Sequence, residues 1–244
     1  MPVEEIVPGL YRILKGYANS YAIEEDGGLV LIDTGLPQRA PRLIAAAREL
    51  GRSPSDVKAI LVTHHHSDHT GSLADLVKLT DASVHVHAAD TPVVSGARPP
   101  PGPNRDRLAG RTMGSLIMRL SNSRAAPAGV DHEVVDGEDL DLAGGIRAIH
   151  TPGHTPGQTS FLWDRQGGVL IAGDAAGARG RTVAPPVGVV TGMFTEDPEE
   201  ARRSFRKLAD LQFEVAVFGH GSPIREGASE AFRSSLRKVR ARRT

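Results

Sequence analysis

Cysteine is absent from the whole 244-residue chain. This absence excludes disulfide bonds, zinc sites built on thiolates and a cysteine nucleophile, and it leaves the redox compartment undecided. Net charge is absent as well, because 29 lysines and arginines balance 29 aspartates and glutamates. A neutral chain is not expected to bind nucleic acid or an anionic membrane surface through general electrostatic attraction.

Long apolar runs are also missing, since no uncharged stretch reaches the roughly 18 residues that a transmembrane helix needs. The amino-terminal stretch MPVEEIVPGL is acidic and has no basic segment followed by an apolar one, so no signal peptide is visible. Hydrophobic residues make up 39% of the chain and charged residues 24%, which is typical of a folded globular protein. We therefore expect a soluble, cytoplasmic protein without membrane contact.

What the sequence does contain is an alternation of short apolar segments with segments of helical periodicity. Apolar or alternating runs predict strands, and apolar residues three and four positions apart predict helices. Their alternation is typical of a layered α/β fold. The expected strands cover residues 10–14, 19–25, 28–35, 57–63, 82–88, 145–154, 167–174 and 213–221, and the expected helices run from Pro37 to Gly51 and over 73–79, 198–211 and 228–243.

Residues 91–131 interrupt this alternation within what we expect to be a single domain spanning 1–244. Six of the 17 prolines fall in this segment, three of them in succession at residues 99–101. One amphipathic helix is expected within it, over 111–120. The segment is either a surface excursion or a lid or wall over a substrate. In the second case its apolar lining would be Met113, Leu116, Ile117 and Met118.

The most informative stretch is THHHSDHTG, residues 63–71. His64 and His66 stand two residues apart just after an expected strand, so both side chains point to one side of an extended backbone. Asp68 and His69 follow, where the chain must turn into a helix. Imidazole and carboxylate groups suit Zn²⁺, Fe or Mn. His65 points to the opposite side and is not expected to be a ligand.

Three further side chains that can bind a metal follow apolar strands much later in the chain. His154 lies within TPGHTPG, whose prolines and glycines fix an irregular backbone around it. Asp174 ends VLIAGD, and His220 lies between two glycines after VAVF. Loops at strand ends build the sites of open α/β sheets. Seven groups would then converge, which suits two metal ions sharing one carboxylate better than a closed structural site of four ligands.

Together these motifs resemble those of the metallo-β-lactamase-fold hydrolase superfamily. The resemblance rests on H-x-H-x-D-H at 64–69, TPGHTPG, GD at 173–174 and GHG at 219–221, with LVLIDTG similar to an early strand motif. It implies an α/β (α+β) fold, the four-layer αβ/βα sandwich, in which helices flank two facing β-sheets. It covers residues of about 20 to 225.

The resemblance also implies how the ligands divide between two divalent metal ions, with Zn²⁺ expected first and Fe or Mn as alternatives. His64, His66 and His154 would bind one ion, and Asp68, His69 and His220 the other. Asp174 would bridge the two. Asp33 would lie behind the ligands and orient them or hold the turn.

The expected mechanism is hydrolysis by a hydroxide that bridges the two metals, since two ions sharing one water lower its pKa. That hydroxide would attack an electrophilic carbonyl or phosphorus, one metal would stabilise the developing oxyanion, and Asp68 or a metal-bound water could protonate the leaving group. A serine nucleophile is not needed, and the sequence shows no G-x-S-x-G elbow to supply one.

The subgroups of the superfamily differ in features that bear on the substrate class. Asp174 stands where one β-lactam-hydrolysing class has a cysteine ligand, and no export signal is visible. Both observations favour the glyoxalase-II-like and lactonase-like branch, which hydrolyses thioesters or lactones. The chain ends 24 residues after His220, too soon for the long helical domain that binds glutathione in true glyoxalase II. Arg179 and Arg181 either contact an anionic, small-molecule substrate or are simply exposed.

Other functions share these ligands and stay open as alternatives. A phosphodiesterase or RNA-processing nuclease should add a basic exosite, and a mononuclear iron oxygenase of sulfur compounds would need only the first ligand set. A non-catalytic metal-binding module would be expected to have lost ligands. The basic end RSSLRKVRARRT is expected to be a solvated helix terminus rather than a nucleic-acid site. Metal identity and oligomeric state are not fixed by the sequence.

Overall fold

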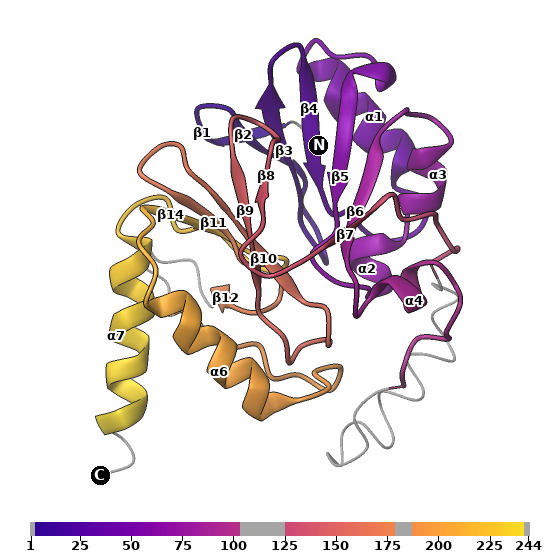
Figure 1. Cartoon of the computed structure of the whole chain (residues 1–244). Coiled ribbons are helices and arrows are strands. Elements are labelled where there is room, and N and C mark those ends of the chain that lie inside the picture. The colour runs from indigo at the N-terminus through magenta and orange to yellow at the C-terminus, as the bar shows by residue number, and fades with distance from the viewer. Residues whose placement is uncertain (1–2, 103–124, 179–186, 242–244) are drawn as a thin grey trace.

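Two β-sheets lie face to face in the middle of the molecule, and helices cover their outer faces (Figure 1). This computed structural model describes residues 3–102, 125–178 and 187–241. The arrangement is the four-layer αβ/βα sandwich, so the predicted fold class is confirmed. The expected helix over 111–120 lies outside the described residues.

The first sheet has its strands in chain order. β1 to β4 are antiparallel neighbours, whereas β4, β5, β6 and β7 run parallel. Parallel strands need crossover connections, and helices supply the first two of them. The strands are β1 Glu4–Val7, β2 Leu10–Leu14, β3 Ser20–Glu25, β4 Gly28–Ile32, β5 Val57–Leu61, β6 Ser83–His87 and β7 His132–Val134, and the helices are α1 Ala40–Glu49, η1 Pro54–Asp56, α2 Ser67–Thr70, α3 Leu73–Val77 and α4 Thr91–Val94.

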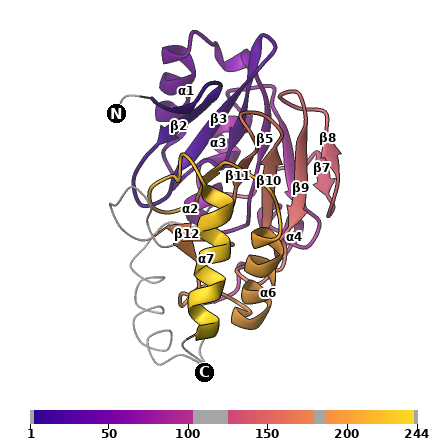
Figure 2. The same ribbon diagram turned by 90° about the vertical axis from the view of Figure 1, so that its left-hand side faces the viewer.

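The second sheet has the order β14-β11-β10-β9-β8. Helices α6 and α7 pack on its outer side, where they lie next to each other in the turned view (Figure 2). A separate two-stranded sheet joins β12 and β13. The elements are β8 Asp139–Leu140, β9 Ile146–His150, β10 Thr159–Trp163, β11 Val169–Ile171, β12 Gly177–Ala178, β13 Val187–Gly188, α6 Pro198–Ala209, β14 Val215–Val217 and α7 Ala228–Ala241.

Apolar side chains fill the space between the two sheets. Ile32 and Leu61 of the first sheet and Phe161, Ile171 and Val217 of the second belong to one buried cluster. Burying a side chain of this size contributes roughly 1.5–3 kcal/mol relative to leaving it in water. Two other clusters lie outside the sheets, one beneath α1 and α3 and one beneath α6 and α7. The apolar core therefore fixes the two sheets against each other without help from the loops.

This packing brings several strand ends to one edge of the sandwich. β4 and β5 are parallel neighbours in the first sheet. β9 and β11 both run antiparallel to β10, and β14 is parallel to β11, so these three strands of the second sheet share one direction. The loops that follow all five strands carry the predicted ligands or Asp33. The fold therefore gathers these side chains from distant parts of the sequence.

Most of the predicted elements are present, with ends that differ by a few residues. The helix expected after Pro37 is α1, and Gly51 follows it in a left-handed conformation with φ +74°. The strands β1, β7, β8, β10, β12 and β13 were not predicted, and the segment 91–131 contains the short helix α4 among its described residues. Within the described parts of the chain, no helix is both long and apolar enough to cross a membrane.

Candidate metal centre

Three imidazoles from two loops form the first group of candidate ligands. His64 and His66 come from the loop after β5, and His154 comes from the loop after β9. The Nδ1 atom of His66 lies 3.1 Å from Nε2 of His64 and 3.1 Å from Nε2 of His154. Burial, reinforced by the neighbouring imidazoles, lowers the pKa of His64 and His66, and burial also lowers that of His154. Neutral imidazoles are the form that binds a metal ion.

A second group combines a carboxylate with two imidazoles. Asp68 and His69 lie on the short helix α2, and His220 follows β14. Nε2 of His220 lies 3.3 Å from Oδ2 of Asp68, and Nε2 of His69 lies 3.7 Å from the same oxygen. The ligand atoms of these three residues all lie within 4.8 Å of one another. The structure thus brings together side chains that are about 150 positions apart in the sequence.

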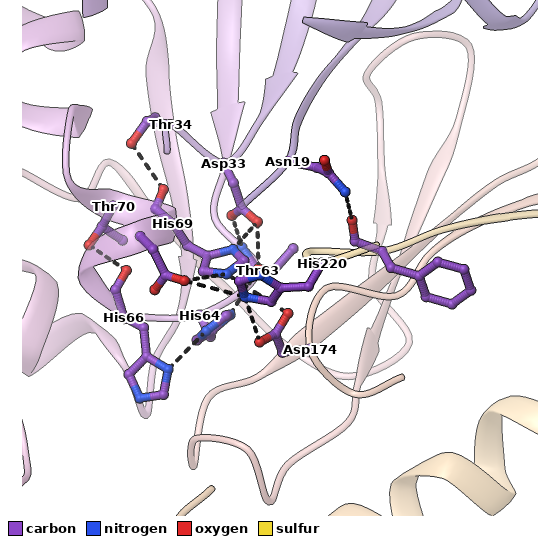
Figure 3. Close-up of polar contacts among 12 residues, drawn as sticks. Asn19, Asp33, Thr34, Thr63, His64, His66, His69, Thr70, Asp174 and His220 are labelled. Carbon is purple, nitrogen blue, oxygen red and sulfur yellow. Dashed lines mark hydrogen bonds and ion pairs between the residues drawn. The ribbon is translucent and has the colours of Figure 1, made fainter. Parts of the chain in front are cut away.

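Asp174 contacts a histidine of each group, and Figure 3 shows its contact with His220. Its Oδ2 atom is 3.3 Å from Nε2 of His154 in the first group and 3.3 Å from Nε2 of His220 in the second. A Cβ atom at Gly219 would approach Oδ1 of Asp174 to 2.2 Å. Glycine at this position therefore leaves the space in which the carboxylate sits.

Two buried polar atoms test whether a cation fits this arrangement. Among the described residues, Nε2 of His69 and Oδ1 of Asp174 are buried without a hydrogen-bond partner, and they lie 3.8 Å apart. A buried polar atom without a partner costs about 1–3 kcal/mol. Nitrogen and carboxylate oxygen atoms that face one another inside a protein are the donor set of divalent metals such as zinc. The residues present therefore fit divalent metal ions.

The electrostatics of the second group favour ionised carboxylates and charged imidazoles. Burial opposes the shift, but His69 and a hydrogen bond from His220 lower the pKa of Asp68 to about 2. Burial likewise opposes the rise for His220, but hydrogen bonds to Asp174 and Asp68 raise its pKa to about 11. Asp68 is a carboxylate at neutral pH, which suits a metal ligand. Its predicted role in protonating a leaving group stays a prediction.

Asp33 holds the loop after β5 from behind (Figure 3). Its Oδ1 accepts the backbone N–H of Thr63 at 2.8 Å, and its Oδ2 accepts the Thr63 hydroxyl and His69 Nδ1, each at 2.7 Å. Nδ1 of His64 lies 3.1 Å from the same hydroxyl. With both Nδ1 atoms engaged, Nε2 of His64 and His69 is directed into the site. This is the arrangement that the predicted orienting role requires.

The turn that carries His220 is held by a segment of the first sheet. Nδ2 of Asn19 donates to the carbonyl oxygens of Phe218 and Gly221, each at 3.0 Å. The Tyr21 hydroxyl donates to the same Phe218 carbonyl at 2.8 Å, and Nδ1 of His220 donates to the backbone carbonyl of Tyr17. Asn19 was not predicted, because an asparagine between two strands carries no signal of a partner 199 positions away.

The remaining predicted residues lie either outside the two ligand groups or outside the described residues. His65 is buried, and its Nδ1 atom lies 3.1 Å from Oδ2 of Asp90 and away from the ligand groups described above. Nδ1 of His154 is 3.2 Å from the hydroxyl of Thr195, a contact that the sequence did not suggest. Arg179 and Arg181 lie outside the described residues, as do the four apolar side chains of the expected lid. Their contact with a substrate stays a prediction.

Comparison with known proteins agrees with this geometry. A profile of the metallo-beta-lactamase superfamily matches residues 14–220. The chain is 30% identical over 265 residues to the probable metallo-hydrolase YflN of Bacillus subtilis, covering 96% of this chain and 91% of that protein. It is 26% identical over 208 residues to the thioesterase pkgB of Emericella nidulans, covering 84% of this chain and 46% of that protein.

Among solved structures, the subclass B3 metallo-beta-lactamase BJP-1 of Bradyrhizobium japonicum matches with a TM-score of 0.71 at 23% identity, over 100% of this chain and 93% of that one. This likeness shows a shared fold. The length of the profile match and the similarity to YflN go further and confirm the resemblance read from the motifs. The chain belongs to the metallo-beta-lactamase superfamily and is a metallo-hydrolase.

Proposed function

We propose that this chain is a binuclear metal-dependent hydrolase that cleaves a carbonyl ester-type bond, either a thioester or a lactone. The observation that carries the proposal is the position of Asp174, whose Oδ2 atom lies 3.3 Å from a histidine of each ligand group. A carboxylate placed in this way can bridge two ions, which lie about 3.5–4 Å apart in two-metal hydrolases. Zn²⁺ is the first expectation for both ions, with Fe or Mn as alternatives.

The residues have separate tasks in this proposal. His64, His66 and His154 would hold one ion, and Asp68, His69 and His220 the other. Divalent ions bound there would lower the pKa of a water molecule and polarise a carbonyl oxygen. The chain's own contribution is to fix the ligands: Asp33 keeps the proton of His69 on Nδ1, so that Nε2 remains free to bind.

Aromatic side chains flank both ligand groups and would contact the substrate. The ring of Phe194 lies 6.1 Å from that of His66, centroid to centroid, and the ring of Tyr17 meets His220 edge-on at 5.4 Å. Tyr17 is 70% exposed and the side chain of His220 is 33% exposed, so this side of the site is open to solvent. Rings on both sides suit a small molecule with an apolar acyl part. The similarity to pkgB, a thioesterase, supports the same class.

The test combines metal analysis with a substrate panel, using protein purified without a His-tag. We expect close to two divalent ions per chain. We also expect hydrolysis of a thioester or a lactone, abolished by a chelator and restored by adding Zn²⁺. Bis-p-nitrophenyl phosphate and a cephalosporin complete the panel. Whichever ester is cleaved faster defines the branch.

Other results would contradict the proposal in distinguishable ways. Cleavage of the phosphodiester alone would make the chain a phosphodiesterase. One iron per chain without hydrolysis would favour an oxygenase. Failure to bind any metal after reconstitution would mean that the two ligand groups do not form a metal centre at all.

A further inference from the structure

Asp90 is a buried carboxylate that belongs to neither ligand group. It lies between β6 and α4 and is 0% exposed. Its Oδ2 atom accepts the backbone N–H of His65 at 2.9 Å and the hydroxyl of Thr155 at 2.8 Å. Its Oδ1 atom accepts the backbone N–H of Gly157 at 2.8 Å. Three donors from two different loops thus converge on a single side chain.

The position of Asp90 in the chain would suggest a local role instead. It is the N-cap residue of α4, where an aspartate side chain usually accepts backbone N–H groups of its own helix. Here the side chain makes no such cap bond and turns toward the two loops. A Cβ atom at Gly157 would lie 2.5 Å from Cγ of Asp90, so only glycine lets the loop approach this closely. The second TPG triplet of TPGHTPG is therefore shaped around Asp90.

The two loops are the ones that carry the first ligand group. His65 separates His64 from His66, and Thr155 is the residue after His154. The loops come from different sheets, since one follows β5 and the other follows β9. Asp90 thus links the loop that carries His64 and His66 directly to the loop that carries His154. The side chain of Asp33, by contrast, bonds to Thr63 and His69, which both follow β5 in the chain.

We propose that Asp90 is a positioning residue for the first metal ion: it fixes the distance between the His64–His66 loop and the His154 loop. The inference rests on the proposed metal centre. It assigns no contact between Asp90 and the metal or the substrate. The backbone N–H of Thr159, where the second loop ends, also donates to the Thr63 carbonyl at 2.8 Å. Without Asp90 the two loops would lose their link next to the ligands themselves, and the ion would bind less tightly. Partners behind metal ligands typically contribute 10–100-fold to affinity.

The test uses substitutions on both sides of the link. Asp90→Asn removes one acceptor oxygen, and Thr155→Val removes the hydroxyl donor with little change of shape. Thr155→Ser keeps the hydroxyl and serves as the matched rescue. Asp131→Asn is the control, because Asp131 also accepts a backbone N–H, that of Val84 at 2.8 Å, outside both ligand loops. Stepwise Zn²⁺ affinities are measured by chelator competition, and amide hydrogen exchange is followed at residues 65 and 157.

In the two disruptive variants we expect one of the two Zn²⁺ affinities to fall about 10–100-fold, with faster exchange at both amides. The other affinity should stay within about threefold, and the lost activity should return at high free Zn²⁺ with an unchanged KM. Thr155→Ser and Asp131→Asn should resemble the parent protein. If Asp90→Asn does not fold, Thr155→Val alone carries the test.

Two results would overturn the inference while leaving the proposed function intact. One is a parent protein that binds two ions, together with a Thr155→Val variant that binds both equally well. The other is an equal loss at both ions, which would indicate general destabilisation rather than positioning. A parent protein that binds no metal would instead contradict the proposed function itself.

Discussion

Asp33 combines an uncommon backbone conformation with three hydrogen bonds to the site. Its φ angle is +58°, in the left-handed region that asparagine tolerates as well as aspartate. Asp33→Asn therefore removes the negative charge without adding backbone strain. His69 would lose the carboxylate that holds its Nδ1 proton, and we expect the affinity for the second metal ion to fall about 10–100-fold. Chelator competition with Zn²⁺ measures the change.

The matched control for this substitution is Asp26→Asn, which changes an exposed aspartate in the turn between β3 and β4. Its metal affinity should equal that of the parent chain. An Asp33→Asn variant that binds both ions as tightly as Asp26→Asn would show that the hydrogen bond at 2.7 Å does not orient His69 in any way that matters for binding.

At the scale of elements, the turn after β14 shows how closely the backbone approaches the site. A Cβ atom on residue 219 would lie 2.2 Å from Oδ1 of Asp174 and 2.6 Å from Cε1 of His69. Asp174 and His69 are buried, so moving either side chain aside would take it out of its position in the candidate metal site. Gly219→Ala should therefore displace the turn or Asp174, and we expect metal affinity to fall by at least about tenfold.

Gly16→Ala is the control for this turn, because no atom lies within 4 Å of the Cβ position at residue 16. Both variants are compared by bound metal per chain and by the urea midpoint of unfolding. Normal metal content in Gly219→Ala would mean that the turn can relax, and that the glycine is not required for the position of the carboxylate.

At the scale of the whole molecule, the sequence predicted the candidate ligands more completely than the contacts behind them. His64, His66, Asp68 and His69 share one motif, and the three distal candidate ligands each follow an apolar strand, where the loops of α/β sheets build their sites. Asp90 carries no such signal. Its partners lie 25 to 67 positions away, and its place before Thr91-Pro92 suggests an ordinary helix cap.

Two of the missed strands, β10 and β1, lack a recognisable pattern because of their burial and their length. β10 is buried at four of its five positions, so it lacks the alternation that marks a strand with one solvated face. β1 has only four residues, too few for a period to be seen. The outer helices were predicted because longer amphipathic segments such as α6 keep one buried face, whereas the pairing of two sheets was implied by the resemblance of the motifs.

Removal of the metals should change how stability depends on pH, because the ligands titrate in opposite directions. Burial lowers the pKa of His64, His66 and His154 below 6.5. In chelated protein their contribution to the free energy of unfolding is therefore lost as the pH falls below that value. The pKa of His69 is raised from 6.5 to about 9, against burial, by Asp33 and Asp68. The contribution of His69 to the free energy of unfolding is therefore complete below pH 6.5 and is lost as the pH rises through 9.

Chelated protein should therefore be most stable near pH 6.5, with the melting temperature falling on both sides. Loaded protein should behave differently above that pH. Binding displaces the protons of His69 and His220, so metal affinity rises with pH and the stability maximum moves to more alkaline values. Thermal melts of both forms between pH 5 and pH 9 measure this. Parallel profiles would mean that these histidines do not bind the metal, since only ligation couples their protons to its removal.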